Sequence, residues 1–316
     1  MKILFTFIPP EKLRDQLKVN FPKISFHYAK GPDAAGKELI EAEVIVTYGE
    51  DLNEDYIHMA QNLKWIMIMS AGMERMPFEA CEKKGIVVTN ARGIHKIPMA
   101  EFTLGTMLQH IKKFPEILRN EQLEDWNRKV KVGELADKHV LILGIGAIGG
   151  EIARLSKAFR MKVTGINRSG RPHEDADVTD TFSNLDKYIS RADFIVSVLP
   201  STGETRYLLT ERHFRMMKPS AAFINIGRGD LVEEGTILKV MQENVIAHAY
   251  LDVFEKEPLP KGHPFWQMEN ITVTPHLSSI TQHYLPRSFE IFEHNLFVYC
   301  NNENNYINLI NLKRGY

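Results

Sequence analysis

Three glycines, at positions 144, 146 and 149, follow a short apolar run at Val140–Leu143 and most constrain what this chain can fold into. A run of this length is typical of a parallel strand buried on both faces. Apolar residues then recur at helical spacing, and a second apolar run covers Lys162–Ile166. A strand, G-x-G-x-x-G, a helix and a second strand, in that order, are the pattern of a dinucleotide-binding unit.

Each glycine has a physical reason in such a unit. The first permits a tight turn, the second lets the backbone approach a pyrophosphate, and the third lets helix and strand pack closely. The helix start contributes free N–H groups and the positive end of its dipole. A ligand-free turn is the alternative, which the two flanking strands disfavour. The predicted cofactor-binding loop comprises Gly144, Gly146, Ala147, Ile148 and Gly149.

The end of the second strand bears on the choice of cofactor. An acidic residue there would bond the ribose hydroxyls and repel a 2′-phosphate, but this sequence has Asn167. Arg168, Ser169 and Arg171 could bind the phosphate through charge-assisted hydrogen bonds. We therefore expect NADP(H) to be favoured, with NAD(H) possible. The alternative is that both arginines are solvated loop charges.

Composition narrows the class of protein. The 316 residues allow two domains, and the net charge of −1 lends no support to binding of nucleic acid or a membrane surface. Cys81 and Cys300 are far apart and have neither metal-ligand nor disulfide spacing, so we predict no metal site and a cytoplasmic location. The apolar run Ile3–Ile8 is too short for a signal peptide and predicts a first strand.

Residues 1–97 predict a second doubly wound parallel unit without the glycine fingerprint. A helix is expected to begin at Pro98 and run to about Lys113, crossing into the second domain. A helix after Tyr284 is expected to cross back. The charged segment Phe114–Val132 carries Trp126 and predicts a surface excursion that a partner could cover. The strands expected in the first domain are Lys2–Ile8, Ile24–Tyr28, Val44–Thr47, Leu63–Met69 and Ile86–Thr89.

Polar side chains follow the later strands of the second domain. Ligands of open α/β sheets bind outside the carboxyl ends of the strands, so these side chains should reach one crevice. The strands expected here are Phe194–Val198, Ala221–Asn225, Ile246–Leu251 and Ile271–Val273, and the side chains that follow them are Arg228, Asp252, Glu257 and His276.

Three of these side chains predict proton transfer and the binding of a carboxylate. His276 is the best proton donor, because histidine titrates near neutral pH. Glu257 bonded to the imidazole would favour the protonated ring and orient it. Arg228, between two glycines, offers a planar fork to a substrate carboxylate. The alternatives are a structural histidine and a loop arginine in a surface ion pair. The small residues of Met69–Glu74 could present N–H groups to a carboxylate, or form an ordinary turn.

Taken together, these segments resemble the D-isomer-specific 2-hydroxyacid dehydrogenases over nearly the whole chain. The resemblance rests on LGIGAIGGEIA, LPSTGETRYLL, INIGRGDLVEEGTI, AYLDVFEKEPLP and TPHLSS, in that order. MSAGMER and GIHKIPMAEFTLGTML are similar to the substrate-domain and hinge segments of that family.

The resemblance implies a role for each matching residue. Arg228 would bind substrate, Glu257 would pair with the histidine, His276 would be the acid/base, and the amides of Ala71 and Gly72 would contact the substrate carboxylate. It also implies a homodimer built largely on the cofactor domains. The chain departs from NAD-preferring members at Asn167. The further cofactor-binding residues would be Asn167, Arg168, Ser169, Leu199, Pro200, Thr205, Ile226, Gly227, Asp252 and Ser278.

We therefore expect an α/β protein of two doubly wound parallel-sheet (Rossmann-like) domains. The cofactor domain, residues 99–284, would be inserted into a discontinuous substrate domain, residues 1–98 and 285–316. The expected function is hydride transfer between a nicotinamide cofactor and a 2-oxo acid or D-2-hydroxy acid, as in the glyoxylate/hydroxypyruvate reductase-like branch, and the side chain of the acid is left open. The alternative is a non-catalytic NAD(P)(H)-sensing interaction protein of co-repressor type, which no basic patch or disordered tail favours.

Overall fold

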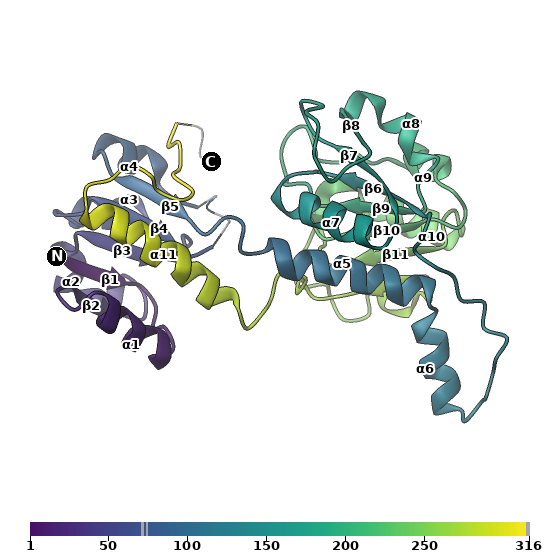
Figure 1. Cartoon of the computed structure of the whole chain (residues 1–316), viewed down its shortest axis with the longest axis horizontal. Coiled ribbons are helices and arrows are strands. Elements are labelled where there is room, and N and C mark those ends of the chain that lie inside the picture. Colours follow the sequence, from purple (N-terminus) through teal and green to yellow (C-terminus); the bar gives the residue numbers. More distant parts are fainter. Residues whose placement is uncertain (71–72, 74, 314–316) are drawn as a thin grey trace. The chain divides into compact units, whose positions relative to one another are not determined.

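The computed structural model describes residues 1–70, 73 and 75–313 and divides into two compact units (Figure 1). Unit 1 comprises Met1–His95 and Thr281–Tyr316, and unit 2 comprises Lys96–Ile280. The sequence predicted these divisions between residues 98 and 99 and between residues 284 and 285. Each unit is an α/β layer structure around one parallel sheet, as expected.

Unit 1 has a five-stranded parallel sheet in the order β2-β1-β3-β4-β5. Its strands are β1 (Lys2–Phe5), β2 (Ser25–Tyr28), β3 (Val44–Thr47), β4 (Trp65–Ile68) and β5 (Val87–Asn90). Its helices are α1 (Glu11–Asn20), α2 (Lys37–Glu41), α3 (Glu54–Met59), α4 (Phe78–Lys83) and α11 (Tyr284–Cys300), with a 3₁₀ turn at Asp33–Ala35.

The C-terminal part of the chain completes unit 1. Helix α11 lies with α1 over one face of the sheet, where Phe292 packs 5.5 Å from Phe5 and 5.7 Å from Trp65 between ring centroids. Helices α2 to α4 cover the other face. The tail then pairs with β5 through an antiparallel bridge between Thr89 and Leu309. Unit 1 is thus built from both ends of the chain (Figure 1).

Unit 2 has a seven-stranded parallel sheet in the order β12-β11-β10-β9-β6-β7-β8. Its strands are β6 (His139–Leu143), β7 (Lys162–Ile166), β8 (Val178–Asp180), β9 (Phe194–Ser197), β10 (Ala222–Asn225), β11 (His248–Leu251) and β12 (Ile271–Val273). Its helices are α5 (Lys96–Ile111), α6 (Phe114–Gln122), α7 (Ala147–Ala158), α8 (Leu185–Ile189), α9 (Glu211–Met216) and α10 (Glu234–Gln242), with 3₁₀ turns at Phe182–Asn184, Gly229–Leu231 and Pro264–Gln267.

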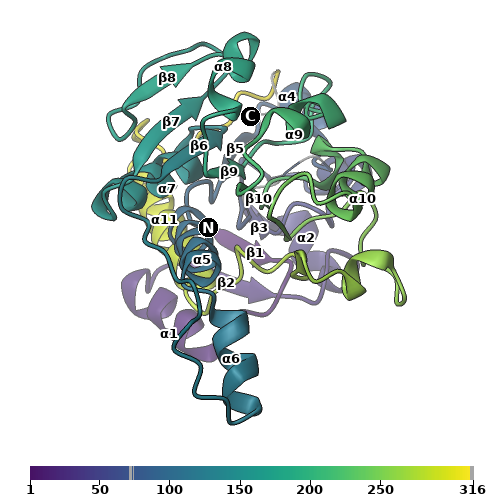
Figure 2. The ribbon, with the colours of Figure 1, turned by 90° about the vertical axis from the view of Figure 1, so that its right-hand side faces the viewer.

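The core of unit 2 has two layers, one on each face of its sheet. Helices α5 and α7 pack on one face, and α8, α9 and α10 pack on the other (Figure 2). The run Val140–Leu143 is fully buried between them, as its uninterrupted apolar sequence predicts. The order in which strands join the sheet reverses at β6, which pairs with β7 on one side and β9 on the other. This reversal is the point at which such sheets bind ligands. Across the described ranges, the helices are all too short or too polar to cross a membrane.

Several strand ends differ from the sequence expectation by one to three residues, and three further differences concern helices and a missed strand. Helix α5 begins at Lys96, so Pro98 lies within its first turn, where a missing N–H costs no helical hydrogen bond. The segment after α5 contains a separate helix, α6, because Lys113 adopts a left-handed φ of 56° and turns the chain. The sequence did not predict β8, whose three residues include a single apolar side chain.

Two half-buried histidines lie where α5 crosses the amino ends of the strands of unit 2. His110 Nδ1 lies 3.2 Å from the Tyr250 hydroxyl, and His248 Nε2 lies 2.8 Å from Thr272 Oγ1. Their ring centroids are 6.0 Å apart. Burial lowers the pKa of each imidazole to about 4, and Lys113 adds to this effect at both rings. Both rings are therefore neutral at pH 7.

The free energy of unfolding should fall as the pH is lowered from about 6.5 towards 4. In this window the unfolded chain binds a proton at each histidine and the folded chain does not, which costs on the order of 2 kcal/mol per ring at pH 5. Urea unfolding at pH 7 and pH 5 measures the loss, and the double variant His110→Gln/His248→Gln should show a smaller one. An equal loss in both proteins would contradict this explanation.

Candidate functional site

The predicted site residues follow the strands of unit 2 at the carboxyl edge of its sheet. They form one row in the order of the strands, because parallel strands turn all their carboxyl ends to the same edge. At one end of the row, His276 follows β12, Asp252 and Glu257 follow β11, and Arg228 follows β10. At the other end, Leu199 follows β9, the glycine loop follows β6, and Asn167 follows β7.

The geometry of the glycine loop fits a dinucleotide. Gly144 has a φ of +99°, in the region that side chains rarely adopt. A Cβ on Gly149 would lie 2.3 Å from the Gly144 carbonyl oxygen, so only glycine allows α7 to approach β6 this closely. A Cβ on Gly146 would meet nothing within 4 Å, and no side chain caps the helix that follows. The first amides of α7, which include those of Ala147 and Ile148, are thus open to a phosphate.

A polar cavity of about 380 Å³ lies beside the end of β7. Asn167 shapes its wall, because its amide nitrogen donates to the Arg171 carbonyl (2.9 Å) and its oxygen accepts from the Ser169 amide (3.1 Å). Among the described residues, neither Arg168 nor Arg171 makes an ion pair, so both cations are available to an anion. The cavity is lined by Ile145, Asn167, Ser169, Arg171, Pro172, His173 and Glu174. Four of these residues, Ile145, Pro172, His173 and Glu174, were not predicted from the sequence, because none belongs to a motif spacing used there.

His276 and Glu257 form the hydrogen-bonded pair that the sequence predicted, with 2.7 Å between Nδ1 and Oε2. The other carboxylate oxygen, Oε1, accepts from the Phe254 amide at 3.0 Å. Glu257 is therefore held by its own loop while it orients the imidazole. Since Nδ1 is engaged, Nε2 is the ring nitrogen that can exchange a proton with a ligand. The His276 side chain is 46% exposed, so a ligand can reach it.

Asp252 holds the segment that carries His276. The Asp252 side chain is 1% exposed, and its carboxylate accepts from the Thr274 hydroxyl (2.6 Å) and from the amides of Leu277 and Ser278 (3.0 Å each). The His276 amide donates to the Asp252 carbonyl at 2.9 Å, with a left-handed φ of 50° at His276. The sequence predicted Asp252 and Ser278 as cofactor-binding residues, and here they shape the backbone around the imidazole.

Arg228 follows β10 and is exposed. Its Nη1 donates to the Gly227 carbonyl (2.9 Å), and its own carbonyl accepts from the Asn225 side chain (2.9 Å). Within the described part of the chain no carboxylate pairs with its guanidinium, in contrast to the alternative of a surface ion pair. The remaining N–H donors of the fork are therefore available to a ligand carboxylate.

The other predicted cofactor residues form the backbone frame of the row. Leu199 and Ile226 are buried, and Gly227 lies against the Leu199 backbone, where a Cβ would be 2.6 Å from its carbonyl oxygen. Thr205 Oγ1 donates to the Pro200 carbonyl (2.6 Å) and so closes the loop after β9. Ala71 and Gly72, predicted to contact substrate, lie outside the described residues.

Comparison with known proteins points to one family. A family model described as "D-isomer specific 2-hydroxyacid dehydrogenase, NAD binding domain" matches residues 104–278. The chain is 32% identical over 252 residues to a glyoxylate reductase of Aeropyrum pernix, covering 77% of this chain and 75% of that protein. It is also 32% identical over 253 residues to a D-3-phosphoglycerate dehydrogenase of Methanocaldococcus jannaschii, covering 78% of this chain but only 47% of that longer protein.

A solved structure supports the same relationship. It is an NADPH-dependent glyoxylate/hydroxypyruvate reductase from Sinorhizobium meliloti, in complex with NADP and sulfate. The two chains are 26% identical, and the match covers 100% of this chain and 99% of that one with a TM-score of 0.80.

Asp252→Asn should destabilise unit 2 by about 2 kcal/mol, because either orientation of the amide turns its N–H donors towards a buried donor. Denaturant unfolding measures the loss. Asp186→Asn is a matched control, since Asp186 makes an exposed ion pair with Arg212 and its loss should change stability little. Equal stabilities of the two variants would show that the bonds of Asp252 do not hold this segment.

Proposed function

Because the chain belongs to the D-isomer specific 2-hydroxyacid dehydrogenases, we propose that it reduces a small 2-oxo acid to the D-2-hydroxy acid with NADP(H). The observation that carries this proposal is the 2.7 Å contact between His276 and Glu257, at the sheet edge that also bears Arg228 and the dinucleotide loop. An imidazole with an oriented carboxylate can donate a proton to a carbonyl oxygen, and a guanidinium can hold the neighbouring carboxylate.

The mechanism assigns a step to each of these side chains. The glycine loop would hold the nicotinamide cofactor, which when bound would supply the hydride that C2 of the 2-oxo acid accepts. Arg228 binds the substrate carboxylate, and His276 Nε2 donates a proton to the oxygen on C2. Glu257 stabilises the imidazolium, so negative charge that develops on that oxygen meets positive charge already in place. In the reverse direction the neutral imidazole accepts the proton. Ala71 and Gly72 are proposed to contribute amide contacts to the carboxylate.

The relatives supply the first substrates to test. The Aeropyrum protein is named a glyoxylate reductase and the Sinorhizobium protein a glyoxylate/hydroxypyruvate reductase. We propose that this chain accepts the same class of short 2-oxo acid. The relatives reported above are named as reductases and dehydrogenases, which favours the enzyme over a non-catalytic sensor of co-repressor type.

The preference for NADP(H) rests on the cavity beside β7. Asn167 carries no charge that would repel a 2′-phosphate, and Arg168 and Arg171 are free of ion pairs among the described residues. A phosphate in this cavity would meet the Arg171 guanidinium and the Ser169 hydroxyl, and Arg168 is the next cation along the chain. The Sinorhizobium relative was solved with NADP bound, which is consistent with this proposal.

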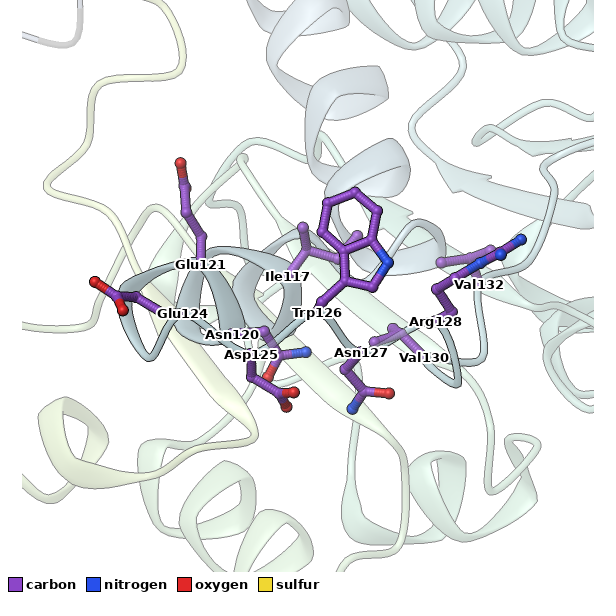
Figure 3. A pocket seen from close by; sticks show the side chains of 10 residues that line it. All are labelled: Ile117, Asn120, Glu121, Glu124, Asp125, Trp126, Asn127, Arg128, Val130 and Val132. Atoms are coloured by element: carbon purple, nitrogen blue, oxygen red, sulfur yellow. The ribbon is translucent and has the colours of Figure 1, made fainter.

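We further propose that the protein is a homodimer that covers helix α6. No residue of α6 is buried, although the segment up to Val132 includes Leu123, 71% exposed, and Trp126, 88% exposed. A helix without a buried face is not stabilised by its own unit, and exposed apolar patches mark interaction sites. Figure 3 shows the side chains that line a cavity of about 610 Å³ on this segment.

Charge complementarity favours a second copy as the occupant of this surface. Acidic residues lie at positions 121, 124 and 125, and basic residues at 128, 129 and 131. In a two-fold symmetric dimer, the acidic residues of each copy would lie opposite the basic residues of the other copy. We also propose a cytoplasmic location, on the ground that Cys81 and Cys300 are both free thiols.

Replacing His276 with Gln should lower kcat for glyoxylate reduction by about a hundredfold to ten-thousandfold, because the change removes the proposed proton donor. The affinity for NADPH, measured by fluorescence, should change little. The wild-type reduction rate should fall as the pH rises, and the oxidation rate should rise. His294→Gln, an exposed histidine on α11, is the control. An unimpaired His276→Gln enzyme would remove this residue from the mechanism.

Asn167→Asp should raise the Kd for NADPH by about ten- to a hundredfold and leave NADH binding equal or tighter, because the new carboxylate repels a 2′-phosphate and accepts from ribose hydroxyls. The ratio of kcat/KM for the two cofactors measures the change. An unchanged ratio would show that the phosphate does not bind beside Asn167.

Trp126→Asp should convert the dimer to a monomer, because a buried carboxylate at the interface is costly. Sedimentation velocity measures the mass. Val19→Asp is the matched control, since Val19 is 77% exposed on α1 of unit 1. A dimer that survives Trp126→Asp, or a wild-type monomer, would overturn the proposed interface.

A further inference from the structure

Three loops of the candidate site meet at one carboxylate that the proposed chemistry does not use. Glu255 Oε1 accepts from the Glu234 amide at 2.7 Å, and Oε2 accepts from the Tyr207 hydroxyl at 3.0 Å. Tyr207 lies in the loop after β9, Glu234 begins α10 after the Arg228 loop, and Glu255 lies in the loop that carries Glu257. One side chain thus bonds the loops that follow three neighbouring strands.

The hydrogen bond from the Glu234 amide to Glu255 caps helix α10 with a side chain from another loop. The residue before α10, Glu233, makes no side-chain hydrogen bond to the first turn. The Glu255 carboxylate satisfies the first amide instead, and its charge faces the positive end of the helix dipole. The far end of the same loop returns to this helix, where His263 Nε2 lies 3.0 Å from Glu234 Oε1. The Glu257 loop is therefore tied to α10 at two points.

Tyr207 connects Glu255 to the loop that carries Arg228. Its amide donates to the Asp230 carbonyl at 2.7 Å, two residues after Arg228, while its hydroxyl reaches Glu255. Tyr207 has a φ of 51°, which is costly for a bulky residue and persists only where surrounding bonds enforce it. The carboxylate raises the pKa of Tyr207 above its ordinary value, mainly through this hydrogen bond, so the phenol remains a donor in neutral solution.

The backbones of the Arg228 and Glu257 loops are also in direct contact. A Cβ on Gly229 would lie 1.9 Å from the carbonyl carbon of Phe254, so no other residue fits between them. Phe254 is the residue whose amide binds Glu257 Oε1. A shift of either loop is therefore transmitted to the other, since close-packed backbones have no free volume to absorb it.

We propose that Glu255 is a positioning residue that holds Arg228 and the Glu257–His276 pair in register by joining Tyr207 to the amino end of α10. This inference rests on the proposed reductase function. Arg228, Glu257 and His276 all lie in exposed loops, and a displacement of about 1 Å in such a constellation costs roughly a hundredfold in rate. Glu255 adds a link between these loops to the restraints from Asp252 and from the contact of Gly229 with Phe254.

Kinetics of three variants test the proposal. Glu255→Ala should lower kcat for 2-oxo acid reduction by about ten- to a hundredfold and raise the KM for the acid, with the Kd for NADPH unchanged. Glu255→Gln should recover most of the rate, because an amide still bonds both partners. Tyr207→Phe removes one bond and should give a smaller loss than Glu255→Ala. The fall in reduction rate with rising pH should begin at lower pH in Glu255→Ala, because a displaced Glu257 stabilises the imidazolium less.

A second measurement does not depend on turnover. The His276 ring signal, assigned in the NMR spectrum by its absence from His276→Gln, should titrate at lower pH in Glu255→Ala than in the wild type. Tyr299→Phe is the matched control, since it deletes a 2.8 Å phenol–carboxylate bond to Glu43 in unit 1. It should change neither the titration nor the kinetics.

The outcomes separate this inference from the proposed function. Wild-type kinetics and titration in Glu255→Ala would overturn the positioning role and leave the function intact. Loss of thermal stability and rate with an unchanged pH profile and titration would also overturn it, because that result describes only a structural bond. A wild-type protein that reduces no 2-oxo acid would overturn the proposed function, and the titration would still decide whether Glu255 positions the pair.

Discussion

Parallel pairing of the seven strands of unit 2 is the constraint on which the candidate site depends. Because every strand runs the same way, residues far apart in sequence are delivered to one edge in the order of the strands. Gly144 and His276 are separated by more than a hundred positions, yet both follow strands of one sheet. The central strands are short and buried, so apolar burial holds the edge in place while the loops remain free to carry polar groups.

Polar bonds then give each loop its shape. Asp252, nearly inaccessible to solvent, accepts three hydrogen bonds from the segment that carries His276. Glu257 accepts from its own loop and from the imidazole, and Glu255 reaches the two neighbouring loops. Three carboxylates within six positions thus have different tasks: one buried restraint, one link between loops and one partner for the imidazole. Identical functional groups are distinguished here by depth and by the donors that face them.

The groups that lack protein partners are as informative as those that have them. Among the described residues, Arg228, Arg168 and Arg171 make no ion pair, although other arginines of unit 2 such as Arg212 do. Unpaired cations at the carboxyl edge of a parallel sheet, beside open helix amides, suit an anionic ligand. The apolar side chains of helix α6 likewise lack a partner within the described part of unit 2. The other long helices of this unit, α5, α7 and α10, each bury a face, and α6 does not.

The sequence by itself determined the fold class and the strand–helix–strand order of the glycine unit, and it predicted the main candidate site residues. Local periodicity and the spacing of Gly144, Gly146 and Gly149 carry that information. Only the tertiary structure decided that Asp252 accepts hydrogen bonds from backbone amides, that His173 lines the cavity beside Asn167, and that Glu255 bonds Tyr207 and Glu234. These relations join residues from different loops, and such partners are chosen by the packing of the sheet rather than by any local pattern.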